Sequence, residues 1–202
     1  MSGGIEIEEI IGIARRAGGA ILEVYGTEFS VEVKEDQSPL TEADKRANAI
    51  IVEGLTRLYP EIPLISEETR AVAYEVRRHW ESFWLVDPLD GTKEFVKRNG
   101  EFTVNIALVK RGVPVLGVVF QPVGNQLYYA VRGEGAWKSA DGAAPMRLNG
   151  GEHYSGKSEV TVVASRSHLT GEVTAFVDEL EAAGKKVEFL SAGSSLKLCL
   201  VA

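Results

Sequence analysis

The chain has 202 residues, a hydrophobic content of 45% and a formal net charge of −7 at pH 7. This hydrophobic content is enough for a packed core and excludes general disorder, and the acidic balance excludes binding to nucleic acid through general electrostatics. No apolar run approaches the ~20 residues that a membrane span requires. Residues 1–9 lack the basic and apolar regions of a signal peptide. We therefore expect a cytoplasmic protein, with attachment to the inner membrane face as an alternative.

The first half of the chain alternates helical and extended patterns. Apolar residues at helical spacing predict a helix over residues 5–25. Residues 31–34 alternate as in a short strand. Thr41 has the character of an N-cap, so a second helix is expected over residues 42–59. Residues 63–66 and 82–86 predict two further strands, of which the second stops at the Asp-Pro step.

The middle of the chain predicts a run of antiparallel strands. Two apolar runs, residues 102–109 and 113–121, flank a Lys-Arg-Gly turn and form a hairpin signal. Residues 126–131 predict a third strand. The stretch 138–158 is rich in Gly, Ala and Ser, and we expect it to be a loop with one short strand near Met146–Leu148.

The C-terminal part of the chain predicts an α/β lobe. A strand over residues 160–164, a helix over 170–183, a strand over 187–190 and a helix opening near 191–195 alternate in order. We therefore expect an α/β protein of α+β layered type, with residues 1–150 as an N-terminal α+β lobe and residues 151–202 as the start of a C-terminal α/β lobe.

The stretch Trp84–Phe95, WLVDPLDGTKEF, has the strongest chemical signal in the chain. An apolar run leads into Asp87 and Asp90, and oxygen ligands at the end of a buried strand suit a hard divalent cation such as Mg²⁺. The Gly-Thr step that follows can present backbone N–H groups and a hydroxyl to a phosphate. The same letters also form turns, since Asp, Pro and Gly are all turn formers. The long apolar lead-in and Thr92 favour a metal site.

This stretch resembles the metal-binding signature of the inositol monophosphatase superfamily of Mg²⁺-dependent, lithium-sensitive phosphatases. Its continuation through Ala107, KEFVKRNGEFTVNIA, resembles the bacterial 3'(2'),5'-bisphosphate nucleotidase branch. The resemblance extends over the whole chain. It implies the layered αβαβα architecture of the sugar phosphatases and hydrolysis of the 3'-phosphate of adenosine 3',5'-bisphosphate by a metal-activated water.

The resemblance also implies roles for individual residues. The implied metal ligands are Glu67, Asp87, the Leu89 carbonyl and Asp90. The implied pair that orients and deprotonates the attacking water is Thr92 with Asp44, which lies in a Thr-x-Ala-Asp motif. From the sequence alone, Asp44 is equally well interpreted as a solvated residue on a helix face.

Two further segments, residues 165–168 and 193–197, are candidates for substrate contacts. Each joins a strand to a helix, where backbone N–H groups and the helix dipole favour anions. By resemblance, the expected substrate-binding residues are Glu67, Leu89, Asp90, Gly91, Thr92, Ser165, Arg166, Ser167, His168, Ser194, Ser195 and Lys197. An ordinary helix cap beside a solvated Arg or Lys is the alternative for both segments.

One departure from the family pattern concerns the end of the chain. The family has a later Trp-Asp signature whose aspartate completes the metal site, and residues 1–202 contain no such dipeptide. We therefore expect that about the last quarter of the family architecture is absent, so that the sequence is C-terminally truncated or incomplete as a catalyst.

Three functions follow as expectations. The first is a Mg²⁺-dependent bisphosphate nucleotidase, the second an inositol or fructose-1,6-bisphosphate type of phosphatase, and the third a chain that binds metal or nucleotide without turnover. A small bisphosphorylated nucleotide is the expected partner, and the sequence does not indicate the oligomeric state.

Overall fold

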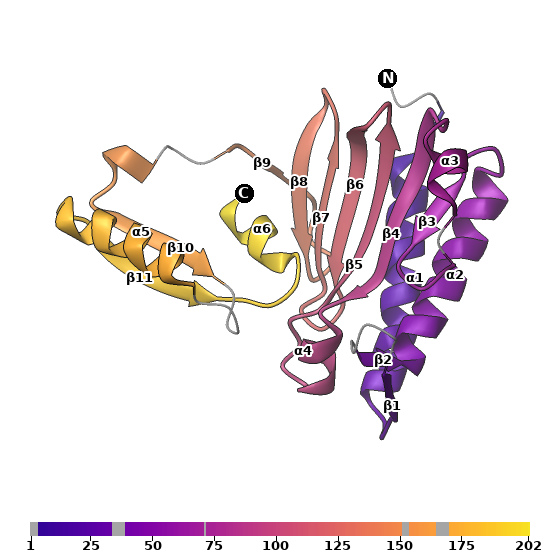
Figure 1. Ribbon diagram of the computed structural model, residues 1–202, viewed down its shortest axis with the longest axis horizontal. Coiled ribbons are helices and arrows are strands. Elements are labelled where there is room, and N and C mark those ends of the chain that lie inside the picture. Colours follow the sequence, from indigo (N-terminus) through magenta and orange to yellow (C-terminus); the bar gives the residue numbers. More distant parts are fainter. Residues whose placement is uncertain (1–3, 34–38, 71, 151–153, 165–169) are drawn as a thin grey trace.

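The computed structural model describes residues 4–33, 39–70, 72–150, 154–164 and 170–202. Its main feature is a seven-stranded sheet with the strands in sequence order (Figure 1). The strands are β3 (Leu64–Ser66), β4 (Ser82–Asp90), β5 (Thr103–Lys110), β6 (Val113–Gln121), β7 (Gln126–Val131), β8 (Gly135–Ala140) and β9 (Met146–Leu148). Within this sheet β3 and β4 are parallel, and each of the other neighbouring pairs is antiparallel.

Two long helices, α1 (Ile7–Tyr25) and α2 (Glu42–Leu58), cover one face of this sheet (Figure 1). The inward residues of the central strands alternate along each strand, as the period of two requires, and they form one hydrophobic core with the apolar faces of both helices. Trp84 is fully buried in this core. Gly18 allows α1 to approach the sheet closely, because a Cβ there would lie 2.5 Å from a ring carbon of Phe120.

The remaining elements of this part of the chain are short. β1 (Val31–Val33) and β2 (Pro39–Thr41) form an antiparallel pair that leads directly into α2. The helix α3 (Tyr74–Arg77) lies between β3 and β4 in the sequence, and α4 (Thr92–Val96) follows β4. The two long helices and strands β1, β3, β5, β6 and β7 agree with the sequence-based prediction, whereas β2 and α4 were not predicted.

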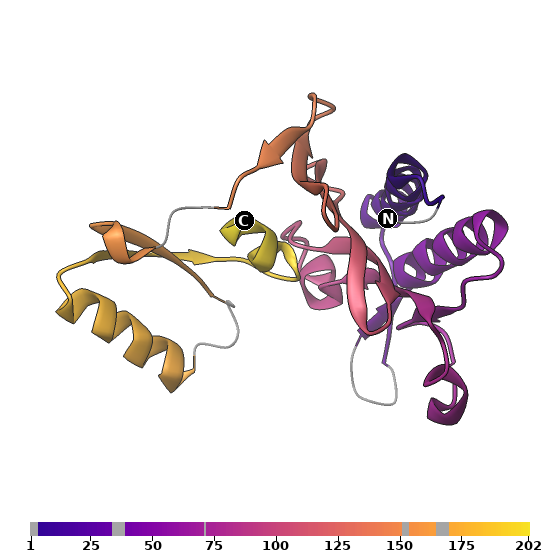
Figure 2. The ribbon, with the colours of Figure 1, turned by 90° about the horizontal axis from the view of Figure 1, so that it is seen from above.

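The C-terminal elements form a second, smaller unit. β10 (Glu159–Ala164) and β11 (Lys186–Ser191) pair in parallel, and α5 (Gly171–Ala182) connects them, as the sequence predicts. A 3₁₀ turn, Tyr154–Gly156, precedes β10. The helix α6 (Leu196–Val201) lies between this unit and the large sheet in both views (Figures 1 and 2). The boundary between two lobes near residue 150 stays a prediction.

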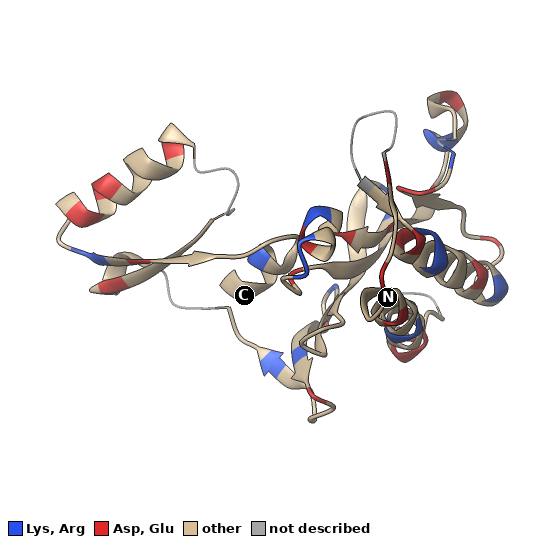
Figure 3. Ribbon diagram, turned by 90° about the horizontal axis from the view of Figure 1, so that it is seen from below, with Lys and Arg blue, Asp and Glu red and all other residues tan. Residues whose placement is uncertain are grey.

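Charge is distributed unevenly over the two units. Figure 3 shows acidic and basic residues mixed along α1 and α2, whereas α5 carries acidic residues only. A cationic contact to a phosphate therefore cannot come from α5. In the described residues, no helix is both long enough and apolar enough to cross a membrane.

Two predicted element boundaries are wrong. The strand expected to stop at Asp87 continues through Pro88 to Asp90, because an irregularity in the pairing with β5 accommodates the proline. Residues 138–140, expected to be loop, belong to β8, which pairs with both β7 and β9. The fold class itself is confirmed as an α/β fold with a mixed sheet and flanking helices.

Candidate active site

The parallel pair β3 and β4 places Glu67 beside Asp87. Ser66 is in register with Val86, and the backbone N–H of Glu67 donates to the Val86 carbonyl at 3.2 Å. Because the carboxyl ends of parallel strands meet at one edge of a sheet, the residues that follow Ser66 and Val86 come together. The structure thus joins two residues that are separated by 20 positions in the sequence.

The end of β4 turns sharply to place Asp90 and Thr92. The Leu89 N–H donates to Asp87 Oδ1 at 3.2 Å, and pairing with β5 resumes at Asp90 opposite Thr103. Gly91 has φ +93°, and a Cβ there would lie 3.1 Å from the Glu101 carbonyl oxygen, so only glycine fits this left-handed position. Helix α4 then begins at Thr92.

Asp44 lies in the interior and contacts Thr92. It is 1% exposed, and its Oδ2 accepts hydrogen bonds from the N–H and the hydroxyl of Thr41, both at 2.7 Å. Its Oδ1 lies 3.2 Å from the Thr92 hydroxyl. The interpretation of Asp44 as a solvated residue on a helix face is therefore wrong, because the capping box of α2 turns the carboxylate inward.

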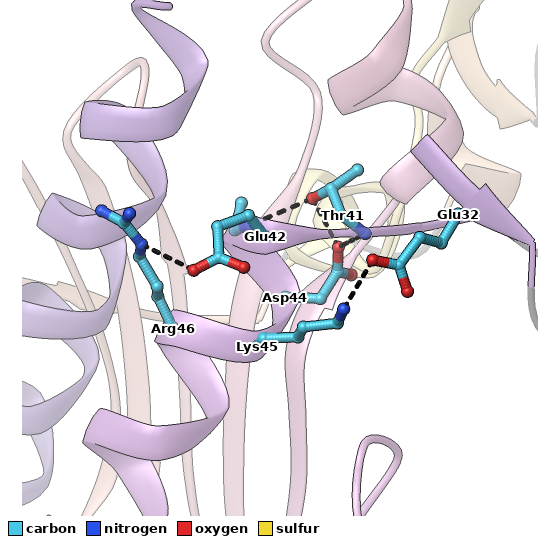
Figure 4. Close-up of polar contacts among 7 residues, drawn as sticks. Glu32, Thr41, Glu42, Asp44, Lys45 and Arg46 are labelled. Atoms are coloured by element: carbon cyan, nitrogen blue, oxygen red, sulfur yellow. Dashed lines mark hydrogen bonds and ion pairs between the residues drawn. The ribbon is translucent and has the colours of Figure 1, made fainter. Parts of the chain in front are cut away.

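Figure 4 shows the charged residues at the start of α2, of which Lys45 and Arg46 form ion pairs and Asp44 bonds to Thr41. Lys45 pairs with Glu32 at 2.7 Å and Arg46 pairs with Glu42 at 3.0 Å, and all four side chains are exposed. Exposed pairs of this kind contribute about 0–1 kcal/mol each. Asp44 alone among these charged residues is buried, so it is the one available to act inside the protein.

Electrostatics distinguishes two of the carboxylates. Burial raises the pKa of Asp87 to about 8, and the nearby charges of Glu67 and Asp90 and a hydrogen bond with Glu67 add to this shift. Burial also raises the pKa of Asp44 above its usual value, against the lowering effect of its hydrogen bonds from Thr41 and Thr92. The carboxyl of Asp87 therefore does not ionise easily without a cation, because it is buried beside two other acidic groups.

This donor set fits Mg²⁺, although it does not form a closed cage. In the ranges that the structure describes, no three or more acidic, His or Cys side chains converge tightly enough to hold a metal ion. Mg²⁺ usually keeps several waters and takes only one or two carboxylates. Glu67, Asp87, Asp90 and the Leu89 carbonyl offer oxygen ligands of that kind, and a cation would relieve the repulsion that raises the pKa of Asp87.

The segment before α6 lies against the same loop. The Gly193 N–H donates to Glu101 Oε2 at 2.8 Å, and the Ser195 N–H donates to Asp90 Oδ2. Lys197 Nζ donates to the Ser194 carbonyl at 2.8 Å. The structure thus brings Ser194 and Ser195 next to Gly91 and Asp90, whereas the Lys197 ammonium bonds back to its own segment, and the contact of all three residues with substrate stays a prediction.

The other predicted substrate segment cannot be placed. Ser165, Arg166, Ser167 and His168 lie outside the described residues. Their assignment to the substrate site stays a prediction.

Sequence reasoning missed two polar residues of β5 that face this site. Thr103 is fully buried and its hydroxyl lies 2.9 Å from the Ser195 hydroxyl. The Asn105 amide accepts a hydrogen bond from the same hydroxyl at 2.9 Å and reaches Asp90 Oδ2 at 3.5 Å. The signal was present, because two polar residues at alternate positions of an apolar strand lie on one face of the sheet.

Comparison with known proteins gives consistent results. Residues 6–202 match the model of the inositol monophosphatase family. A 3'(2'),5'-bisphosphate nucleotidase CysQ of Salmonella typhimurium is 48% identical over 198 residues, which are 97% of this chain and 76% of that protein. The same enzyme of Escherichia coli K12 is 46% identical with the same coverage.

A solved structure shares the fold as well. The crystal structure of CysQ from Bacteroides thetaiotaomicron superposes with a TM-score of 0.79 at 42% identity, and the match covers 96% of this chain and 75% of that one. Sequence similarity and fold thus agree. The chain therefore belongs to the inositol monophosphatase family and is a phosphatase of that superfamily.

Proposed function

We propose that the chain is a Mg²⁺-dependent phosphatase that converts adenosine 3',5'-bisphosphate to AMP and inorganic phosphate. The observation that carries the proposal is the contact between Thr92 and Asp44, which lie 48 positions apart. It joins a hydroxyl at the start of α4 to a buried carboxylate, directly beside the candidate metal ligands. The relatives named bisphosphate nucleotidases support the choice of substrate.

The chain's own residues supply the base for a single-step hydrolysis. Thr92 Oγ1 accepts a proton from the attacking water while its own proton passes to Asp44 Oδ1, 3.2 Å away. Thr41 holds the other oxygen of Asp44 through two hydrogen bonds, so the accepting oxygen keeps its direction. Burial raises the pKa of Asp44, which makes it a stronger proton acceptor than an exposed aspartate.

The remaining groups bind and orient the phosphate. Glu67, Asp87, Asp90 and the Leu89 carbonyl would hold Mg²⁺, which when bound supplies Lewis acidity and stabilises charge on the phosphate oxygens. Gly91 allows the loop to take the left-handed turn that begins α4, where the backbone N–H groups of Gly91 and Thr92 would bind the scissile phosphate.

The first test is removal of one ligand charge. We expect Asp90→Asn to lose most Mg²⁺-dependent release of phosphate from adenosine 3',5'-bisphosphate, by about 10²-fold or more, because a metal ligand loses its charge. Asp178→Asn, an exposed aspartate of α5, is the matched control and keeps full activity. Full activity of Asp90→Asn would remove Asp90 from the metal site.

The second test concerns the substrate. Initial rates on adenosine 3',5'-bisphosphate and on inositol 1-phosphate are compared at equal Mg²⁺, and the nucleotide is expected to be hydrolysed faster. A faster rate on inositol 1-phosphate would instead support an inositol-type phosphatase. Nucleotide and Mg²⁺ binding in calorimetry without release of phosphate would show a binding chain without turnover.

A further inference from the structure

Four polar groups form a hydrogen-bonded chain that ends at Asp90. The hydroxyls of Thr103 and Ser195 lie 2.9 Å apart, and Ser195 Oγ donates to Asn105 Oδ1 at 2.9 Å. The Asn105 amide nitrogen lies 3.5 Å from Asp90 Oδ2. The same carboxylate oxygen also accepts the backbone N–H of Ser195.

The direction of this chain follows from the number of protons. A hydroxyl has one proton, and Ser195 donates its proton to Asn105. Thr103 must therefore donate to Ser195, and the Asn105 amide, which accepts through its oxygen, presents its nitrogen to Asp90. Every donor thus points toward the carboxylate, the arrangement in which hydrogen bonds strengthen one another.

Close packing holds the segment that carries Ser195 in place. A Cβ on Gly193 would lie 2.6 Å from Glu94 Cγ and 3.0 Å from the Glu101 carbonyl oxygen. The Ser194 Cβ lies 3.2 Å from the position that a Cβ of Gly91 would take. The backbone at Gly193 and the Ser194 side chain therefore pack closely against the residues on either side of Asp90, and Gly193 has no room for a larger side chain.

From this geometry we infer that Ser195, Asn105 and Thr103 are positioning residues that fix the orientation of the Asp90 carboxylate for metal binding. The inference rests on the proposed function, in which Asp90 is a metal ligand. Ligating carboxylates are commonly held by partners outside the coordination shell, and loss of such partners lowers metal affinity about 10–100-fold. In this arrangement the C-terminal unit contributes to the metal site through Ser195.

The test measures Mg²⁺ binding by calorimetry on the chelator-treated chain without nucleotide. We expect Ser195→Ala and Asn105→Leu to weaken Mg²⁺ binding about 10-fold or more, because each breaks the path to Asp90. Ser195→Thr keeps the hydroxyl and restores near-normal affinity. Ser139→Ala is the matched control, since Ser139 is a buried hydroxyl that donates to the Ala143 carbonyl far from the site.

The outcomes separate the two proposals. Wild-type Mg²⁺ affinity in a folded Ser195→Ala variant, with normal binding by the parent, would overturn the positioning role alone. Failure of the parent chain to bind Mg²⁺ would overturn the proposed function and this inference with it. Thr103→Val gives a second variant should Ser195→Ala fail to fold, and a lower melting temperature with unchanged Mg²⁺ affinity would show a structural role only.

Discussion

Asp44 uses its two carboxylate oxygens for different purposes. One oxygen closes the capping box of α2 with Thr41, and the other faces Thr92. A helix cap normally lies at the surface and contributes about 1 kcal/mol to stability. Here the cap is buried, so the same contacts that begin the helix also fix the proposed base.

Replacement of Asp44 by Asn should separate these two roles. We expect kcat to fall by about 10²–10⁴-fold, because the amide cannot accept the proton passed on by Thr92. KM and the melting temperature should change little, since Asn keeps an acceptor for Thr41. Steady-state kinetics and thermal melting check this prediction. An unchanged kcat would exclude Asp44 as the base.

The raised pKa of Asp87 gives the metal-free chain a defined pH dependence. Its pKa is 3.8 when unperturbed and about 8 in the folded chain. The folded state therefore holds this proton more tightly, and the stabilising effect is fully present below pH 3.8 and lost as the pH rises toward about 8. Above that pH the loss is complete.

We expect the metal-free chain to be less stable at pH 8 than at pH 5 through Asp87, and we expect Mg²⁺ to reduce this difference. Urea melts of the chelator-treated chain between pH 5 and pH 8 should show an Asp87 contribution that decreases with pH, and Asp87→Asn should lack it. Mg²⁺ should stabilise the chain more at pH 8 than at pH 5, because it competes with the proton. Stabilisation by Mg²⁺ that is equal at both pH values would contradict the assignment.

At the scale of elements, two adjacent glycines of α1 differ in their surroundings. A Cβ on Gly18 would lie 2.5 Å and 2.8 Å from ring carbons of Phe120 and 3.1 Å from Pro122, whereas a Cβ on Gly19 would meet no atom within 4 Å. Replacement of either glycine by alanine stabilises the helix by about 1 kcal/mol through higher helix propensity. Only Gly18 is required for the packing of α1 on the sheet.

The matched pair Gly18→Ala and Gly19→Ala therefore isolates this packing. We expect Gly19→Ala to raise the free energy of unfolding by about 0.5–1 kcal/mol. We expect the free energy of unfolding of Gly18→Ala to be lower than that of Gly19→Ala by about 1–3 kcal/mol, because the added methyl overpacks the contact with Phe120. Chemical denaturation of both variants measures the difference. Equal stabilities would show that α1 shifts freely on the sheet.

The strands differ in how well the local sequence predicts them. The hairpin of β5 and β6 was predictable because two apolar runs flank a short turn that contains a glycine. In the structure the turn residues Arg111 and Gly112 both have positive φ, as a two-residue hairpin turn requires. The continuation of β4 through Pro88 was not predictable, because proline normally ends a strand and only the pairing with β5 accommodates it. β8 was missed in part because its small residues give a weak strand pattern.

At the scale of the whole molecule, the segment Gly193–Ser195 joins the smaller C-terminal unit to the large sheet. Its hydrogen bonds to the large sheet and its loops include those to Glu101, Asp90, Thr103 and Asn105. The position of α6 between the two units follows from this attachment (Figure 2). The attachment therefore affects both the stability of the C-terminal unit and the geometry of the site.

Replacement of Gly193 by Ala should loosen this attachment. The added methyl would lie 3.0 Å from the Glu101 carbonyl oxygen, so we expect a loss of about 1–3 kcal/mol and faster amide exchange in residues 193–201. Gly171→Ala, where a Cβ meets no atom within 4 Å, is the control and should exchange normally. Identical exchange in the two variants would contradict the prediction.

The sequence alone determined the fold class, most of the element types and the presence of the carboxylate motif in Trp84–Phe95, because periodicity, caps and a long motif are local properties. Only the tertiary structure decided that Asp44 is buried against Thr92 and that Thr103, Asn105 and Ser195 converge on Asp90. The physical reason is that strand register and the docking of the C-terminal unit bring together residues up to 105 positions apart. No local pattern in the chain specifies such distances.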